Sequence, residues 1–222
     1  PGRITWRGEE RVPLDVAALP GIVSDFRREG GEAIAICLLH SYINPTHEQR
    51  VKEVVAPILG DLSICISYEV LPEYREYERF STTVLNAYLM PVMHRYLTTL
   101  EEGLRGDDPA SGMRIGPQVP VMIMESSGGV MTAKAAREKP VYTVLSGPAG
   151  GVVASTFIGR LTGHPNLITI DIGGTSTDIC LIDQATPNML TEGRIDIYNI
   201  KAPMIDMHTV GAGGGSIAWL AA

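Results

Sequence analysis

Short apolar runs alternate with segments of helical periodicity along most of this 222-residue sequence. The apolar runs over residues 33–39 and 62–68 are typical of strands that are covered on both faces. Residues 13–29, 45–59 and 81–104 carry apolar side chains near helical spacing. This alternation predicts an α/β fold with a mainly parallel sheet and helices on both of its faces.

Local signals refine the first half of this pattern. Thr46 is a candidate N-cap for the helix over 45–59. Pro91 is expected to kink or offset the helix over 81–104. Residues 106–118 are rich in Gly, Pro, Ser and Asp, so they are predicted to form a loop.

The second half of the chain is predicted to contain shorter elements and more turns. Strands or extended segments are expected over 119–124 and 141–145, with a short helix over 132–137 between them. A glycine-rich turn at 146–151 then leads into a helix of small residues over 152–160.

Composition and charge narrow the possible functions. The formal charge of −7 and the pI near 5.2 argue against a nucleic-acid partner, which needs a basic face. No apolar run reaches the length of about 18 residues that a membrane helix needs. Cys37, Cys65 and Cys180 each lie in an apolar run and form no Cys-x-x-Cys pair. They are therefore interpreted as reduced, buried thiols of a cytoplasmic protein.

The most specific chemical motif is a glycine turn between two apolar runs. Residues 171–178 read Asp-Ile-Gly-Gly-Thr-Ser-Thr-Asp, and predicted strands flank them over 167–170 and 179–182. Gly173 and Gly174 permit positive φ and place no side chain in the way. Successive backbone N–H groups at such a turn converge on phosphate oxygens, so the motif predicts a phosphate site.

Hydroxyl and carboxylate side chains complete this motif. Thr175, Ser176 and Thr177 add hydroxyl donors for a phosphate. Asp171 and Asp178 would repel a phosphate, so they are interpreted as catalytic residues that position water and hold a divalent metal. The alternative is a plain hairpin, in which the polar side chains only form hydrogen bonds within the turn. The full pattern favours phosphate binding over this alternative.

A second glycine run follows downstream and includes Gly213, Gly214 and Gly215. Two interpretations of it stand equal: nucleotide binding where a glycine turn enters a helix, or a tight turn with close packing. Just upstream, Asp206 and His208 would point to one face of a strand. There they would either share a metal ion or form a simple Asp–His hydrogen bond.

Several segments together resemble the hydantoinase A/5-oxoprolinase family. They are residues 145–151, 171–178 and 206–216, with 69–73 and 125–129 as further matches. The hairpin resembles the phosphate hairpins of actin, sugar kinases and ATP-dependent chaperones. The resemblance implies a partial actin-like ATPase fold of the ribonuclease H-like type, α/β with a mixed sheet and flanking helices.

The resemblance also implies an activity. Similar proteins use ATP to open a cyclic amide such as a hydantoin or 5-oxoproline, and relatives use ATP to carboxylate ketones. It implies ATP and Mg²⁺ or another divalent metal as cofactors, a small cyclic amide as substrate, and a second, hydantoinase B-like subunit. A subunit that binds nucleotide for regulation or as a scaffold is the alternative outside catalysis.

The resemblance divides the chain at residue 80. It implies that residues 1–80 end the family's N-terminal region and that residues 81–222 begin the hydantoinase A core. Members of the family carry an additional Asp-Gly-Gly-Thr hairpin near the N-terminus, and this sequence has only one such hairpin. The chain is therefore interpreted as a fragment, and we expect it to bind ATP weakly or not at all by itself.

Overall fold

The computed structural model describes residues 2–105, 116, 119–195, 197–217 and 219. The chain divides into two compact units, which are described separately. Unit 1 comprises Pro1–Val121, Thr132–Val141 and Gly193–Lys201, and unit 2 comprises Met122–Met131, Tyr142–Glu192 and Ala202–Ala222.

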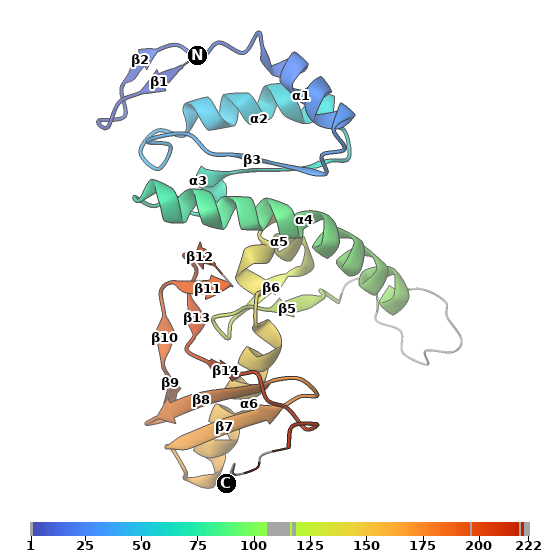
Figure 1. Cartoon of the computed structure of the whole chain (residues 1–222), viewed down its shortest axis with the longest axis vertical. Coiled ribbons are helices and arrows are strands. Elements are labelled where there is room, and N and C mark those ends of the chain that lie inside the picture. Colours follow the sequence, from blue (N-terminus) through green and yellow to red (C-terminus); the bar gives the residue numbers. More distant parts are fainter. Residues whose placement is uncertain (1, 106–115, 117–118, 196, 218, 220–222) are drawn as a thin grey trace. The chain divides into compact units, whose positions relative to one another are not determined.

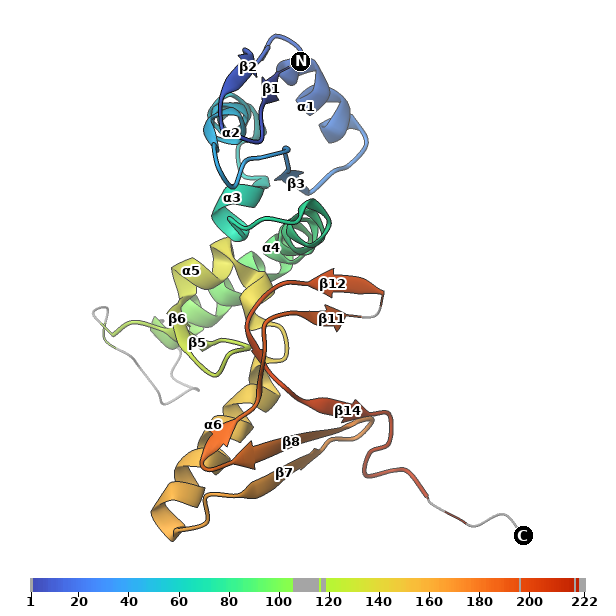
Figure 2. The same cartoon turned by 90° about the vertical axis from the view of Figure 1, so that its left-hand side faces the viewer.

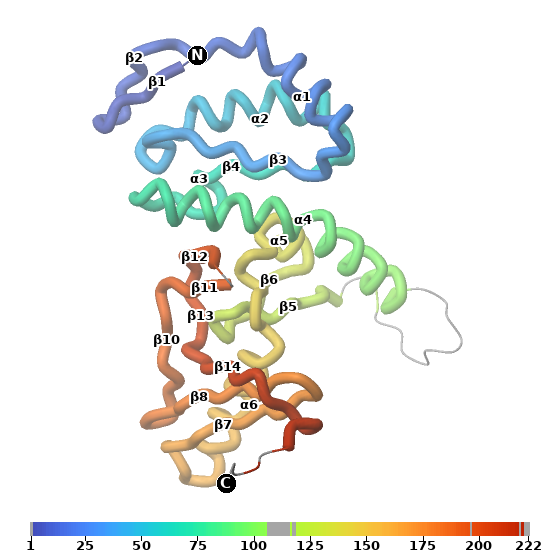
Figure 3. The backbone as a smooth tube through the Cα atoms, in the orientation of Figure 1, coloured from blue at the N-terminus to red at the C-terminus, as the bar shows by residue number. Residues whose placement is uncertain are grey.

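Unit 1 is built on a two-stranded parallel sheet. Strands β3 (Ala33–Ile36) and β4 (Ser63–Ile66) pair along their whole length, as the backbone trace in Figure 3 shows. Parallel strands need a long crossover connection, and α2 (Thr46–Leu59) provides it. The predicted parallel pairing of these two apolar runs is therefore confirmed.

Helices cover both faces of this small sheet. Helix α1 (Leu19–Arg28) packs on α2, and α4 (Glu76–Arg105) packs on β3 and β4 from the other side (Figure 1). The core between α1 and α2 contains Val23, Val55 and Leu59, all of them buried. Burial of apolar side chains on both faces explains why the two strands read as continuous apolar runs.

The remaining elements of unit 1 are short. They are β1 (Arg3–Ile4), β2 (Glu10–Val12), α3 (Ser67–Val70), α5 (Ala133–Glu138), β11 (Gly193–Ile195) and β12 (Tyr198–Ile200). The predicted helix near 132–137 is confirmed as α5. Thr132 caps it, because its Oγ1 accepts a hydrogen bond of 3.2 Å from the backbone N–H of Ala135.

Unit 2 is built on an antiparallel sheet. Strands β7 (Leu167–Ile172) and β8 (Thr177–Asp183) form a hairpin, and β14 (His208–Val210) pairs with the other edge of β8 (Figure 2). Strand β9 (Thr186–Pro187) also pairs with β8. Helix α6 (Ser146–Thr162) packs along β7 and β8.

The core of unit 2 lies between α6 and this sheet. Its buried residues are Ala149, Val152, Cys180, Ile182 and Ile205. The remaining short strands are β5 (Met122–Met124), β6 (Val130–Thr132), β10 (Met189–Leu190) and β13 (Met204–Ile205). The expectation of a mainly parallel sheet is wrong here, because a turn of only four residues joins β7 to β8 and permits only antiparallel pairing.

Three local predictions are also corrected. Thr46 is the first residue of α2 rather than its cap, and Asn44 Oδ1 accepts a hydrogen bond of 3.0 Å from the Thr46 N–H. The segment expected to be extended at 141–145 contains a 3-10 helix over Pro140–Thr143. The segment 146–151, expected to be a glycine-rich turn, is instead helical and forms the first turns of α6, where Ala149 is buried in the core.

Other expectations concern the ends of elements and the cysteines. The long helix contains Pro91 as predicted, and it also includes the charged residues from Glu76 onward. The predicted loop at 106–118 lies outside the described residues apart from Gly116. All three cysteines are free thiols. Across the described part of the chain, no helix combines the length and apolarity that a membrane span requires.

Candidate phosphate-binding site

The predicted glycine hairpin forms, and its turn is open at the tip. The N–H of Gly173 donates a 2.9 Å hydrogen bond to the carbonyl of Ser176, which closes the turn. Gly174 and Thr175 are exposed, and a Cβ added to Gly174 would meet no atom within 4 Å. Neither Gly173 nor Gly174 has a positive φ, so that expectation is wrong. Gly174 provides open space beside the backbone, whereas a Cβ added to Gly173 would lie 3.3 Å from the carbonyl oxygen of Ser176.

The second glycine run packs directly on this turn. The N–H of Gly214 donates a 2.9 Å hydrogen bond to the carbonyl of Gly173. A Cβ added to Gly213 would lie 2.6 Å from the carbonyl oxygen of Gly174, closer than real Cβ contacts allow. Residues 211–217 form turns and bends rather than the start of a helix. Close packing is therefore the role that the geometry of Gly213 requires.

Two hydroxyl groups hold the glycine run in place. Thr177 Oγ1 donates a 2.6 Å hydrogen bond to the carbonyl of Ala212. Ser216 Oγ accepts a 3.1 Å hydrogen bond from the N–H of Gly213. The Thr177 hydroxyl, which the sequence suggested as a phosphate donor, thus links the hairpin to the second glycine run.

The two candidate carboxylates face each other across the hairpin. Asp171 pairs with Asp178 in the β7–β8 register, and Thr209 of β14 pairs with Asp178 on the other side. Directly opposite residues share one face of a sheet, so the three side chains form a row. Thr209 Oγ1 donates a 2.6 Å hydrogen bond to Asp178 Oδ1. Sequence reasoning missed Thr209, because a threonine in a short strand carries no distinctive signal.

A cavity of about 590 Å³ lies between α6 and the hairpin. Asp171 and Asp178 both line it, together with Gly151 and Ser155 of α6. Most of the other lining side chains are apolar, among them Val152, Ile158, Ile179 and Met207. The carboxylate pair therefore borders a largely apolar cavity.

Asp206 and His208 are placed differently from this pair. Both are exposed, whereas Met207 between them packs against the buried core of unit 2. His208 pairs with Ile179, the neighbour of Asp178, so its side chain projects from the opposite face of the sheet. Among the described residues, no group of three or more His, Cys, Asp or Glu side chains forms a metal cluster.

The thiol next to this site is poorly suited to nucleophilic chemistry. Cys180 is buried in the core of unit 2. Burial raises the pKa of its thiol, and the nearby negative charge of Asp206 raises this pKa further. Because the thiolate is the reactive form, Cys180 serves as a small core residue, as predicted.

Comparisons with known proteins agree with this geometry. The family model described as hydantoinase/oxoprolinase matches residues 79–222, and that of the hydantoinase/oxoprolinase N-terminal region matches residues 1–59. Caprolactamase subunit alpha of Pseudomonas jessenii is 41% identical over 219 residues, which is 99% of this chain and 30% of that protein. 5-Oxoprolinase 1 of Arabidopsis thaliana is 36% identical over 206 residues, 92% of this chain and 15% of that protein.

A solved structure gives the same result. The nucleotide-free structure of acetone carboxylase, from a study of ATP-dependent acetone carboxylation, aligns with a TM-score of 0.81 and 28% identity. The alignment covers 96% of this chain and 29% of that one. The prediction of a partial, actin-like α/β ATPase fold is thereby confirmed. The chain spans about 30% of the length of the caprolactamase subunit. The chain belongs to the hydantoinase/oxoprolinase family.

Proposed function

We propose that this chain is the nucleotide-binding part of an enzyme that uses ATP to open a cyclic amide. One observation carries the proposal: an exposed glycine turn at 173–176 is held by the glycine run 211–215, next to a pair of facing carboxylates. Family membership supports it, as does the similarity to a caprolactamase subunit and a 5-oxoprolinase.

In this proposal the turn holds the phosphates of ATP. Gly174 leaves the backbone open, so that the successive N–H groups of Gly174 and Thr175 can surround phosphate oxygens. The N–H of Gly173 closes the turn instead, through its bond to the Ser176 carbonyl. Thr175 and Ser176 add hydroxyl donors beside them. The run containing Gly213, Gly214 and Gly215 keeps the turn in shape and offers further backbone close to the nucleotide.

The facing carboxylates suit a divalent cation. Mg²⁺ prefers oxygen ligands and is usually bound by one or two carboxylates together with substrate phosphates. Asp171 and Asp178 would supply those ligands from one face of the hairpin, and Thr209 would keep Asp178 oriented. When bound there, the cation neutralises charge on the phosphates during transfer. Asp206 and His208 fit this role less well, because His208 projects from the other face.

The chemistry explains why ATP is needed. The carbon of an amide is a poor electrophile, and its oxygen is a poor leaving group. Transfer of the γ-phosphoryl group to the amide oxygen forms a P–O bond there and breaks the bond to ADP. Water then attacks the carbon, and the ring C–N bond breaks as the nitrogen takes up a proton, which leaves an acyl phosphate. A second water hydrolyses this acyl phosphate to the carboxylate and free phosphate. Asp171 or Asp178 would orient the first water and accept its proton.

A second candidate reaction is ATP-dependent carboxylation of a ketone. The alignment with acetone carboxylase, with a TM-score of 0.81, favours it as the alternative. Bicarbonate separates the two reactions, since only carboxylation consumes it. The relatives named as subunits also support a second subunit, which we propose to be hydantoinase B-like.

The direct test uses the full-length protein with its second subunit. Release of ADP and of ring-opened product is measured with ε-caprolactam, hydantoin and 5-oxoproline, with and without bicarbonate. We expect one of these amides to be opened without bicarbonate, with one ADP formed for each ring opened. Asp178→Asn should abolish both ADP release and ring opening. ATP binding without turnover of any amide or ketone would contradict the proposed enzymatic function and favour a regulatory subunit.

A further inference from the structure

The hairpin of unit 2 has an edge without a partner strand. In the sheet order β14-β8-β7, strand β7 is the outer strand, and among the described residues no strand pairs with its other edge (Figure 2). The N–H of Gly173 bonds to Ser176, and hydrogen-bonded and non-hydrogen-bonded pairs alternate along antiparallel strands. The N–H groups of Ile168, Ile170 and Ile172 therefore point away from β8, toward this free edge.

This edge carries none of the features that keep free strand edges from pairing. Exposed edge strands in natural proteins are usually very short, or they carry lysine, proline or a β-bulge. Strand β7 has six residues, reads Leu-Ile-Thr-Ile-Asp-Ile, and pairs with β8 in continuous register without a bulge. Such a long apolar edge pairs easily with another strand, so we expect it to be covered in the full-length protein.

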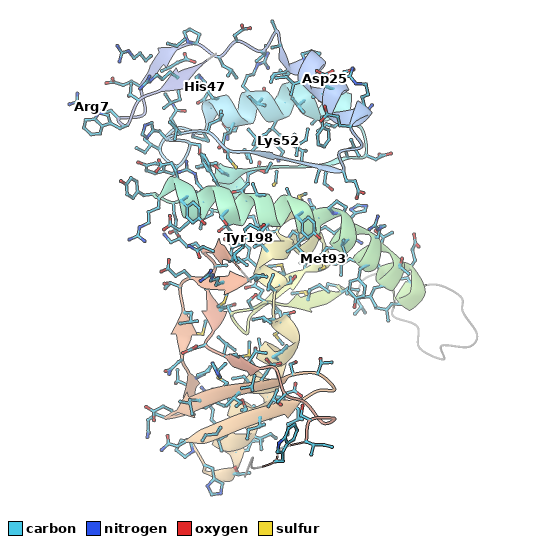
Figure 4. All side chains as sticks on the ribbon, viewed as in Figure 1. Arg7, Asp25, His47, Lys52, Met93 and Tyr198 are labelled. Carbon is cyan, nitrogen blue, oxygen red and sulfur yellow. The ribbon has the colours of Figure 1, made fainter. Side chains whose placement is uncertain are left out.

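The outer face of the hairpin is also apolar and uncovered. Side chains project from both faces of the hairpin (Figure 4), and those of Leu167, Cys180 and Ile182 belong to the core against α6. The opposite face carries four large aliphatic side chains that are 56–65% exposed: Ile168, Ile170, Ile172 and Leu181. Strands that are apolar on both faces are typical of a sheet that is covered on both sides.

The cavity of about 590 Å³ extends along β7. Its lining includes residues 167–171 of this strand and, on α6, Gly151, Ala154, Ser155 and Ile158. These four positions have the i, i+3, i+4 and i+7 spacing of one helix face. A strand paired with β7 would lie about 4.8 Å from it, next to this face of α6. The cavity therefore has the position of a missing strand.

We propose that the full-length protein fills this cavity with a strand of its own chain, from the segment that follows residue 222, and that the same segment covers the outer face of the hairpin. Residues 1–59 match the family's N-terminal region, and the chain spans about 30% of the caprolactamase subunit, so much of the further length of that relative follows the matched part. Residues 211–217 lie against the hairpin, where Gly214 bonds to Gly173, so the chain that follows them starts beside it.

With a strand in this position, the cavity is part of the core of unit 2 and not a substrate pocket. The turn at 173–176 is not in its lining and stays open. A ligand then reaches Asp171 and Asp178 from the end of the hairpin where the turn lies. The free edge, the apolar face and the cavity are independent of the reaction that the full-length protein catalyses.

Hydrogen exchange of the full-length protein without its second subunit tests the edge directly, with residue resolution from mass spectrometry. The N–H of Thr169 points to β8 and serves as the internal reference. We expect the N–H groups of Ile168 and Ile170 to exchange within about tenfold of the rate of Thr169, because both edges of β7 are then hydrogen-bonded. Exchange that is faster than this at Ile168 and Ile170 would show a free edge and overturn the proposal.

A lysine substitution tests the outer face. Ile170 is 60% exposed here, and lysine is well tolerated on an exposed edge strand. On a covered face, Ile170→Lys buries a charge, so the melting temperature of the full-length protein should fall by at least about 5 °C. Ile22→Lys is the matched control, because Ile22 is 59% exposed on α1 and its substitution should change the melting temperature by less than about 2 °C. An unchanged melting temperature in Ile170→Lys would overturn the covered face.

The exchange measurement also separates the possible occupants of the edge. A strand of the same chain protects Ile168 and Ile170 in the isolated full-length protein at every concentration. Protection that appears only after the second subunit is added would assign the edge to that subunit. Protection that weakens on dilution would assign it to a second copy of the chain. Either of these two results would overturn the assignment to the segment after residue 222.

Discussion

Two regions of this chain are built in opposite ways. In unit 2, the phosphate site is made from backbone: Gly173, Gly174 and Gly213 bring two chain segments together without side chains. In unit 1, the segment that follows β3 is held by buried side chains, above all Glu48 and Arg79, which both hydrogen-bond to the backbone of Leu38. A backbone site depends on space and fails when a methyl group is added. A side-chain site depends on hydrogen bonds and fails when a partner is removed.

A large effect on nucleotide affinity is expected from a methyl group at Gly213. In Gly213→Ala the new Cβ would lie 2.6 Å from backbone atoms of Gly174, which cannot move aside as a flexible side chain can. The turn must shift, so we expect affinity for Mg-ATP to fall by about 100-fold, or roughly 2.7 kcal/mol. Calorimetry on the full-length protein measures this. Unchanged affinity would show that the close packing of the two glycine segments does not matter for binding.

The corresponding change in unit 1, Glu48→Ala, removes a hydrogen-bond acceptor. Glu48→Ala leaves three hydrogen-bond donors without their acceptor, and each buried donor left unsatisfied should lower stability by about 1–3 kcal/mol. Urea unfolding followed by circular dichroism reports this. Glu53→Ala is the control, because Glu53 forms only an exposed pair with Arg50 and should change stability by less than about 1 kcal/mol. Equal effects in both variants would show that the network is not stabilising.

An intermediate effect, on the rate, is expected when the side chain of Thr209 in unit 2 loses its hydrogen bond to Asp178. Thr209→Val removes the hydroxyl that donates to Asp178 but keeps the shape of the side chain. Loss of one such hydrogen bond should lower kcat by roughly threefold to tenfold, with little change in KM for ATP. Thr209→Ser should restore the rate. A wild-type kcat in Thr209→Val would show that Thr209 is not needed to orient Asp178.

The smallest effect concerns the thiols of unit 1. Burial, the largest cause, raises the pKa of Cys37 to about 12 and that of Cys65 to about 11. At pH 8 both thiols are protonated and should react with iodoacetamide much more slowly than a free cysteine of pKa about 8.5. Their reactivity should keep rising above pH 9, where a free cysteine levels off. Mass spectrometry of alkylated peptides tests this, and a plateau near pH 9 would contradict it.

The same contrast explains what the sequence could predict. The hairpin around Gly173 was readable because its glycines and flanking apolar strands are adjacent in sequence. Residues 146–151, the first six residues of α6, were predicted as a turn, because glycines favour turns unless tertiary packing overrides their propensity. The rest of that helix, over 152–160, was predicted correctly. No local signal marks Glu48 as a buried residue, since its partners lie ten to twenty positions away. Contacts of that kind exist only in the folded chain.

The central claim is that the turn at 173–176 holds the phosphates of ATP. The most direct measurement is calorimetric titration of Mg-ATP into the full-length protein with its second subunit, with wild type beside Gly174→Val and Gly103→Ala. Both glycines have open space around the added Cβ, so neither change should disturb packing. We predict that Gly174→Val loses ATP binding, because its side chain occupies the phosphate position, while Gly103→Ala binds as wild type does. Equal affinity in all three proteins would contradict the assignment of this turn.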